Sequence, residues 1–396
     1  MRTAIIGGRV LDGTGDPPID DGLVVVSGNV IEHAGHRGGY KLEGDISRVD
    51  ARGKTILPGL FNCHAHLCHP EPQDPEFSWP TPAVSILLAT KYARQTLESG
   101  VTTVRDMGSY HDGTVGLRDA IARGVIVGPR ILVSVRPITI TGGHWHFVGV
   151  EADGPDDVRR KAREQLKAGA DHIKLMATAG VGTPGQRGTE TQFTREEIAA
   201  AVDVAERAGK RVAAHAHADQ GVLDCVEAGV TTIEHGSGIS QRTATLMAER
   251  GVFLVPTMQV LYFIAERGSE IGVPAWKVEN SKRRLEIRAR NLPVALREGV
   301  LLAFGTDSGG RYSPHGEIVT EMKLLHDLGV STSDVIHCAT LASARACGMD
   351  DRLGSLEAGK LADVVVVDGN PLDDFEAFRK VVMVLKEGEL VVNKSA

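Results

Sequence analysis

Two histidines separated by one residue, His64 and His66, are the first candidates for chemistry in this chain. They follow residues 57–61, which are mostly apolar, as expected for a buried strand. Side chains two residues apart on a β-strand point to the same face, so both imidazoles would share one side. Neutral imidazole nitrogen is a common ligand of divalent metals. A His-x-His pair by itself is weak evidence, because such pairs also arise by chance on surfaces.

Further ionisable side chains stand in or after later apolar stretches. Each has another interpretation when taken alone. His235 could be a hydrogen-bonded core histidine, and Asp307 could cap the segment that follows it. Lys174 could bury its aliphatic stem while its ammonium reaches solvent. If the stretches are successive strands of one barrel, all of these side chains stand at the same end of it, and such a convergence favours a metal site. These candidates are Lys174, His215, His235 and Asp307, with His217 as an alternative to its neighbour His215.

The elements that would position these residues form a repeating pattern. From residue 54 onward, short apolar strands alternate with helical stretches, which is typical of parallel β/α architecture. A capping box at 194–197 marks the start of one of these helices. The sequence therefore predicts a (β/α)8 TIM barrel, whose chemistry lies where the strands end. The eight expected strands are 56–61, 101–105, 130–135, 172–176, 212–217, 231–234, 252–256 and 301–305.

The two ends of the chain have a different pattern. Residues 2–56 are predicted to form short strands separated by Gly, Asp and Asn turns, and strand-like segments return after residue 360. We expect both ends to form one small β-sandwich domain, made of 1–56 with 358–396, beside a metal-dependent catalytic barrel at 57–357.

The composition narrows the class of protein. The chain has 396 residues, a net charge of −7 and 42% hydrophobic residues. An acidic balance without basic runs argues against nucleic acid or an anionic membrane as the main partner. No apolar run reaches the roughly 18 residues that a membrane span needs. The cysteines form no CxxC pair and the N-terminus does not resemble a signal peptide, so we expect a cytoplasmic protein. We also expect a homo-oligomer that acts on a small molecule.

Lys174 points to a chemistry that the histidines alone do not suggest. An ammonium cannot bind a cation, but burial beside a metal lowers the pKa of a lysine. A neutral amine can take up carbon dioxide to form a carbamate, whose two oxygens can bridge two metal ions.

The ordered set of histidines, lysine and aspartate, on a barrel with a split β domain, resembles the amidohydrolase superfamily. The segments 58–60, before the histidine pair, and 339–346 and 354–364, near the C-terminus, resemble it as well. Within it, the chain looks most similar to the imidazolonepropionase-like branch that includes metal-dependent Xaa-Pro dipeptidases. One departure is Asn62, where the superfamily usually has aspartate.

This resemblance implies a binuclear metal centre, with zinc as the expected metal. One metal ion is expected on His64, His66 and Asp307, the second on His215 and His235, and a carbamate on Lys174 would bridge them. A bridging hydroxide would attack an amide carbonyl, while Asp307 moves the proton to the leaving nitrogen. His144, after the third strand, could stabilise the oxyanion, although a loop histidine held by a Gly-rich turn is an equal alternative.

The expected substrate is a dipeptide of the Xaa-Pro type or a related N-acyl amino acid. Cyclic amides such as an imidazolone or hydantoin, and carbamate or urea compounds, are alternatives. Lys174 weighs against a deaminase, and the intact set of ligand positions weighs against a non-catalytic scaffold. Loop residues that could meet a substrate carboxylate, or equally form surface contacts, are Arg136, Arg187, Arg311 and Tyr312.

Overall fold

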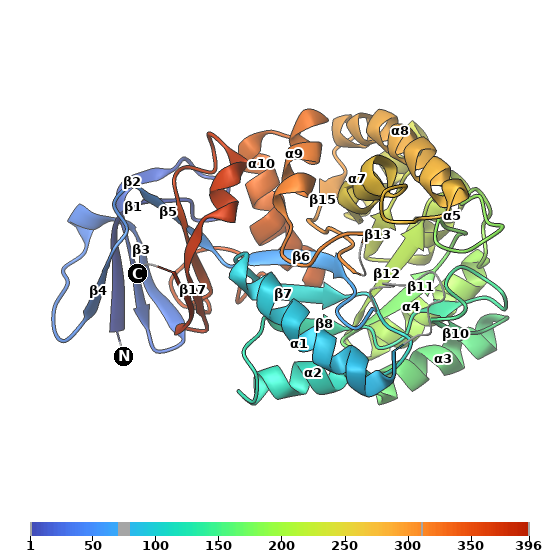
Figure 1. Ribbon diagram of the computed structural model, residues 1–396, viewed down its shortest axis with the longest axis horizontal. Helices are drawn as coiled ribbons and strands as arrows, with labels where there is room; N and C mark the ends of the chain where they lie inside the picture. Colours follow the sequence, from blue (N-terminus) through green and yellow to red (C-terminus); the bar gives the residue numbers. More distant parts are fainter. Residues whose placement is uncertain (1, 70–79, 310–311, 395–396) are drawn as a thin grey trace.

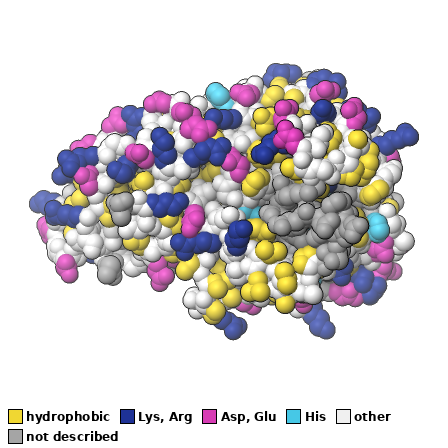
Figure 2. Space-filling model, in the orientation of Figure 1, with side chains coloured by type: hydrophobic (Ala, Val, Ile, Leu, Met, Phe, Trp, Pro, Cys, Tyr) yellow, Lys and Arg dark blue, Asp and Glu magenta, His cyan; other side chains and the backbone are white. Residues whose placement is uncertain are grey.

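A computed structural model describes residues 2–69, 80–309 and 312–394. The chain forms a sheet domain, which holds the first and last strands, and a larger α/β domain (Figure 1). Acidic and basic side chains are intermingled on the face shown in Figure 2. Within the described ranges, no helix combines the length and apolar character needed to cross a membrane.

The sheet domain combines strands from both ends of the chain. Its strands are β1 Arg2–Val10, β2 Ile19–Ser27, β3 Val30–His36, β4 Ser47–Asp50, β5 Lys54–Pro58, β16 Val364–Asp368, β17 Val381–Lys386 and β18 Glu389–Asn393. They form one sheet in the order β18-β17-β16-β5-β1-β2-β3, with β4 beside β1. Ile31 of β3 and Met383 of β17 share one buried apolar cluster, so the sheet curves around its core. Strands from the two chain ends therefore pair in one continuous sheet.

The larger domain is built on parallel strands. They are β6 Leu60–Ala65, β7 Val101–Asp106, β8 Arg130–Val133, β9 Ile138–Thr139, β10 Val150–Glu151, β11 His172–Met176, β12 Arg211–Ala216, β13 Thr232–His235, β14 Phe253–Val255 and β15 Leu301–Leu302. Two runs of paired strands result, β6-β7-β8 and β10-β9-β11-β12-β13-β14-β15. The amide of Asp171 donates to the carbonyl of Val133 (2.7 Å), and the amide of Cys63 donates to that of Phe304 (2.7 Å). These bonds link β8 to the residue before β11 and β6 to the segment after β15, in a TIM-barrel-like α/β arrangement.

Helices lie between these strands and on the outside of the domain (Figure 1). The predicted capping box is confirmed, because Thr194 and Glu197 exchange side-chain-to-backbone hydrogen bonds at the start of α4. The helices are α1 Pro82–Glu98, α2 Gly113–Ala122, α3 Pro155–Lys167, α4 Arg195–Arg207, α5 Asp219–Ala228, α6 Gln241–Glu249, α7 Met258–Arg267, α8 Ala275–Arg297, α9 Val319–Asp327, α10 Thr332–His337 and α11 Ser343–Cys347.

The strand expected at 56–61 is two strands in the structure. β5 pairs with β16 in the sheet domain, whereas β6 pairs with β7 in the α/β domain. The break falls at Gly59, where a Cβ atom would lie 2.1 Å from Oγ1 of Thr102. Only glycine lets the backbone pass this close to β7, so the chain changes domain at this residue.

Helices α10 and α11 are joined by a π-helical turn, Cys338–Ala342. Directly after it, the hydroxyl of Ser343 donates to the carbonyl of Cys338 (2.6 Å) and accepts from the amide of Phe304 (2.9 Å). The turn therefore anchors the segment that follows β15 and that carries Asp307.

Candidate metal centre and active-site pocket

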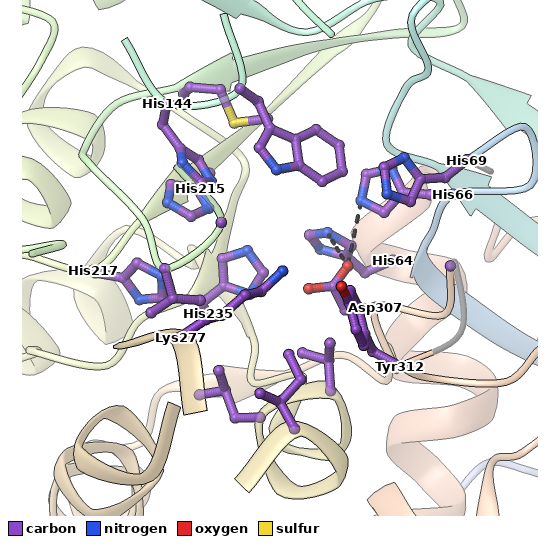
Figure 3. A pocket seen from close by; sticks show the side chains of 18 of the residues that line it. His64, His66, His69, His144, His215, His217, His235, Lys277, Asp307 and Tyr312 are labelled. Atoms are coloured by element: carbon purple, nitrogen blue, oxygen red, sulfur yellow. Dashed lines mark ion pairs between the residues drawn. The ribbon is translucent and has the colours of Figure 1, made fainter. Parts of the chain in front are cut away.

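His64 and His66 lie at the end of β6 and face Asp307, as the dashed lines in Figure 3 show. Their Nε2 atoms lie 3.6 and 3.3 Å from Oδ1 of Asp307. One ligand-type atom from each of the three residues falls within 4.8 Å of the others. The amide of Asp307 donates to the carbonyl of His64 (2.8 Å), so backbone pairing holds the cluster together.

The second nitrogen of each imidazole has a fixed partner. Nδ1 of His64 lies 2.7 Å from a carboxylate oxygen of Glu234, and Nδ1 of His66 lies 2.9 Å from the carbonyl oxygen of Gly108. Acceptors at Nδ1 keep the proton there and leave the Nε2 lone pair for another group. Burial also lowers the pKa of His64 to about 4, so its ring is neutral near neutral pH.

Glu234 and Arg105 form a buried ion pair beneath the cluster, which the sequence analysis did not identify. Nη2 of Arg105 lies 2.9 Å from the carboxylate oxygen that does not contact His64. Burial by itself would raise the pKa of Glu234, but Arg105 and His64 lower it to about 2. Both residues are charged side chains inside apolar strands, and that was the signal available in the sequence.

Lys174 extends from β11 into the same region and is buried. Among the described residues, its Nζ has no hydrogen-bond partner. Burial lowers the pKa of this amine to about 8, which makes the neutral form accessible. A buried donor without an acceptor is costly, so this amine fits a site that holds a further group.

His215 and His235 lie next to the first cluster, on β12 and β13. Their ring centroids are 4.7 Å apart, and that of His235 is 4.8 Å from that of His64. Nε2 of His215 lies 3.4 Å from the carbonyl oxygen of Ala179, and Nδ1 of His235 lies 2.6 Å from Oγ1 of Thr257. One nitrogen of each ring therefore remains for another ligand.

His217, the alternative to His215, also lines the pocket. Its Nδ1 lies 3.0 Å from the hydroxyl of Ser237, and its ring stacks on that of His235 at 5.1 Å. Burial lowers the pKa of both His215 and His217 well below its usual value. His215 lies closer to His235 than His217 does, because its ring centroid is 4.7 Å from that of His235, compared with 5.1 Å for His217.

Two of the candidate residues have left-handed backbone conformations. The φ angle is 74° at His235 and 54° at Asp307, and neither residue is glycine. Such conformations cost of order 1–3 kcal/mol and cluster at functional sites, where the surrounding structure imposes them. His235 is the last residue of β13 and Asp307 lies in the segment after β15, and both side chains face the pocket (Figure 3).

His144 lies against the histidine cluster. Its ring stacks on that of His215 with centroids 4.4 Å apart, and its Nδ1 lies 3.0 Å from the hydroxyl of Thr183. Burial is the main cause that lowers the pKa of His144 to about 3. The ring is therefore a neutral group at the pocket and not only a loop residue packed in a turn.

Asn62 connects β6 to the segment that carries Asp307. Its side-chain oxygen accepts from the amides of His64 and Thr306, both at 3.2 Å, and its nitrogen donates to the hydroxyl of Thr306 at 2.8 Å. The position that departs from the superfamily pattern thus makes three hydrogen bonds that hold β6 and the segment with Asp307 together.

The candidate metal ligands, together with His144 and His217, line one cavity of about 250 Å³ (Figure 3). It combines the histidines with an apolar wall and with cationic side chains. The described lining residues are His64, His66, His69, His144, Trp145, Phe147, Lys174, Met176, Val181, Gly182, His215, His217, His235, Val260, Leu261, Ile264, Lys277, Arg288, Asp307, Gly309 and Tyr312.

Of the four loop residues considered as possible contacts of a substrate carboxylate, Tyr312 lines this cavity. Arg136 instead donates to the carbonyl oxygens of Val148 (3.0 Å) and Gly149 (2.6 Å) and so holds its own loop. Arg187 is exposed and outside the cavity lining, and Arg311 lies outside the described residues.

A family model and several known proteins are similar to this chain. A model of the Amidohydrolase family matches residues 55–391. The crystal structure of a Xaa-Pro dipeptidase with bound methionine is 33% identical with a TM-score of 0.91, covering 98% of this chain and 99% of that chain. That of a prolidase complexed with N-methylphosphonate-L-proline is 30% identical with a TM-score of 0.92, covering 99% and 100%. Ochratoxinase of Aspergillus niger is 28% identical over 432 residues, covering 98% of this chain and 86% of that protein.

Proposed function

Because the chain belongs to the amidohydrolase family of metal-dependent enzymes, we propose that it is a binuclear metal hydrolase that cleaves a dipeptide or a related N-acyl amino acid. The predicted resemblance to Xaa-Pro dipeptidases is confirmed, and the chain is a hydrolase of carbon–nitrogen amide bonds. The number of metal ions and the substrate class are the proposal. The names of the similar dipeptidase and prolidase support a substrate with a peptide bond.

The residues around the pocket fit two metal ions. His64, His66 and Asp307 would hold one, and His215 and His235 would hold the other. The observation that carries this proposal is the buried Lys174 amine, which has no hydrogen-bond partner among the described residues. As a carbamate it would present two anionic oxygens to the ions. When bound, such ions polarise a carbonyl and make a bound water acidic enough to react at neutral pH.

The protein groups then supply proton transfer and charge stabilisation. Burial works against ionisation of Asp307, but His64 and His66 hold its pKa well below the usual value. Asp307 therefore starts as a carboxylate that can take a proton from water and deliver it to the leaving nitrogen. His144, held by Thr183 and by stacking on His215, would donate a hydrogen bond to the oxygen that becomes negative.

The fold supports this assignment. We infer that the two runs of parallel strands form one closed (β/α)8 barrel, with β8 beside β11 and with β6 beside the segment after β15. In such a barrel the active site lies at the carboxyl ends of the strands. The candidate ligands follow this rule, because His66 directly follows β6 and His235 is the last residue of β13.

The test is metal analysis of the purified protein together with its mass and a library of dipeptides and N-acyl amino acids. We expect two divalent ions per chain, one added carbon dioxide on Lys174, and release of free amino acids. Lys174→Ala should lose both the added mass and the paired ions, whereas Lys167→Ala, at the exposed end of α3, should keep them. One ion with an unmodified lysine would overturn the binuclear centre, and no hydrolysis of any library member would overturn the substrate class.

A further inference from the structure

Lys277 reaches the catalytic pocket from the first turn of α8. Its Nζ lies 4.4 Å from the centroid of the Tyr312 ring. Figure 3 shows the ammonium end directed into the pocket, on the side of His235 and Asp307. The contact with the ring face is a cation–π interaction, and the ammonium lines the same cavity as the candidate metal ligands.

The other cationic side chains of the pocket have structural tasks. Nη1 of Arg288 donates to the carbonyl oxygens of Pro256 and Thr257, and its Nε donates to the hydroxyl of Ser237 (3.1 Å). Arg288 thus fixes the chain after β14. Lys174 lies within the candidate metal cluster. Lys277 instead directs its ammonium into the open part of the pocket, where a ligand would lie (Figure 3).

An apolar surface adjoins Lys277. Val260, Leu261 and Ile264 share one face of α7, the helix that packs against α8, and all three line the pocket. The described lining contains one acidic side chain, Asp307, which contacts His64 and His66. A ligand that matches these features has a negative group for Lys277 and an apolar group for α7.

We propose that Lys277 binds the free α-carboxylate of the substrate, and that the α7 face receives the side chain of the same amino acid. This rests on the proposed function and narrows its substrate class. In a dipeptide or an N-acyl amino acid, the free carboxylate belongs to the amino acid that leaves with the scissile nitrogen. Lys277 therefore selects amides whose leaving group is an apolar amino acid with a free carboxylate, and it disfavours C-terminally amidated analogues.

The test compares each hydrolysed substrate with its C-terminal amide, in the metal-loaded enzyme. The wild type should prefer the free acid. Lys277→Met should raise the KM for the acid by about 10–100-fold, with a small effect on kcat and on the amide, since a hydrogen bond to a charged group is lost. Lys282→Met, on the exposed side of the same helix, is the matched control and should behave as wild type.

Tyr312 provides a second, milder perturbation. Tyr312→Phe keeps the ring and should keep the preference for the acid. Tyr312→Leu removes the ring and should raise the KM for the acid by about 3–10-fold while leaving that for the amide unchanged. If Lys277→Met raises the KM for the acid and for the amide by the same factor, so that the ratio between them is unchanged, the assignment is overturned.

Binding of the free amino acid separates this inference from the proposed function. L-leucine and L-leucinamide are titrated calorimetrically into metal-loaded wild type and Lys277→Met. Tighter binding of L-leucine to the wild type, lost in the variant, supports Lys277 even if no library member is hydrolysed. Hydrolysis of the library with equal leucine binding by both proteins would instead retain the proposed function and reject Lys277.

Discussion

Glu234 holds Nδ1 of His64 at 2.7 Å from its carboxylate, and so directs the opposite nitrogen of that ring toward Asp307. Partners of this kind typically change metal affinity by about 10–100-fold when they are removed. We expect Glu234→Gln to weaken metal binding by this factor, measured by competition with a chelator. The variant also leaves Arg105 without its charge partner, so folding should be checked first by circular dichroism. Glu227→Gln, at the Arg195 pair on the surface, is the control. Unchanged metal affinity would show that Glu234 does not orient His64.

Removal of metal should reveal the cost of burying Lys174. In chelator-treated protein, Lys174→Met replaces a buried amine that lacks a partner among the described residues by an apolar chain of similar length. We expect the metal-free variant to be more stable to urea than the metal-free wild type by about 1–3 kcal/mol. With metal present the order should reverse, because the variant cannot gain binding energy from paired ions. A metal-free variant that is less stable than wild type would contradict this account, and Lys167→Met provides the reference for a surface change.

Gly59→Ala should destabilise the protein by about 1–3 kcal/mol, because the new methyl group would meet Thr102. Urea denaturation measures the effect. Gly38→Ala is the control, since no atom lies within 4 Å of the added Cβ. The double variant Gly59→Ala with Thr102→Ala should recover part of the loss. No recovery would mean that the contact with Thr102 is not the cause.

Glu321 predicts a pH dependence of stability. This α9 residue is buried, accepts hydrogen bonds from the amides of Met258 (3.0 Å) and Gln259 (2.7 Å), and burial raises its pKa from 4.5 to about 7. Between these values the folded state holds a proton that the unfolded state has released. Its contribution to the free energy of unfolding therefore falls as the pH rises from about 4.5 to 7, by up to about 3 kcal/mol, and is constant above.

Glu321→Gln isolates this contribution. The variant loses an acceptor for one backbone amide and should be less stable at low pH, but its stability should lack the decline between pH 4.5 and 7. Urea denaturation at several pH values in this window measures both slopes. Parallel curves for wild type and variant would show that Glu321 does not titrate in this range.

Much of the fold was accessible from local patterns. The strand His172–Met176 was predicted with its observed bounds, and the capping box of Thr194 and Glu197 forms as expected. Both depend on residues close in sequence. The division at Gly59 depends on its approach to Thr102, which belongs to another strand and has no local signature.

The candidate site divides in the same way. His64 and His66 share a face because strand geometry requires it, and that requirement can be read from two residues. Glu234 and Arg105 pair only because the intervening strands bring them together in the interior of the domain. Lys277 lies in a helix with several other basic residues, and no sequence feature distinguishes it from Lys282. The contribution of such residues becomes visible only from tertiary contacts.

The pairing of β5 with β16 constrains how the protein can be made. Thr55 donates a hydrogen bond to the carbonyl of Gly369, 314 residues later in the chain. A ribosome adds about 5–20 residues per second, so the edge of β5 waits roughly 15–60 s for its neighbour. During that time the edge is open to other strands. The strand that bears His64 begins one residue after β5 ends, so a nascent chain that stops before β16 would present an unfinished sheet edge a few residues before the candidate metal ligands. We therefore expect chaperone dependence to be greatest for C-terminally truncated chains.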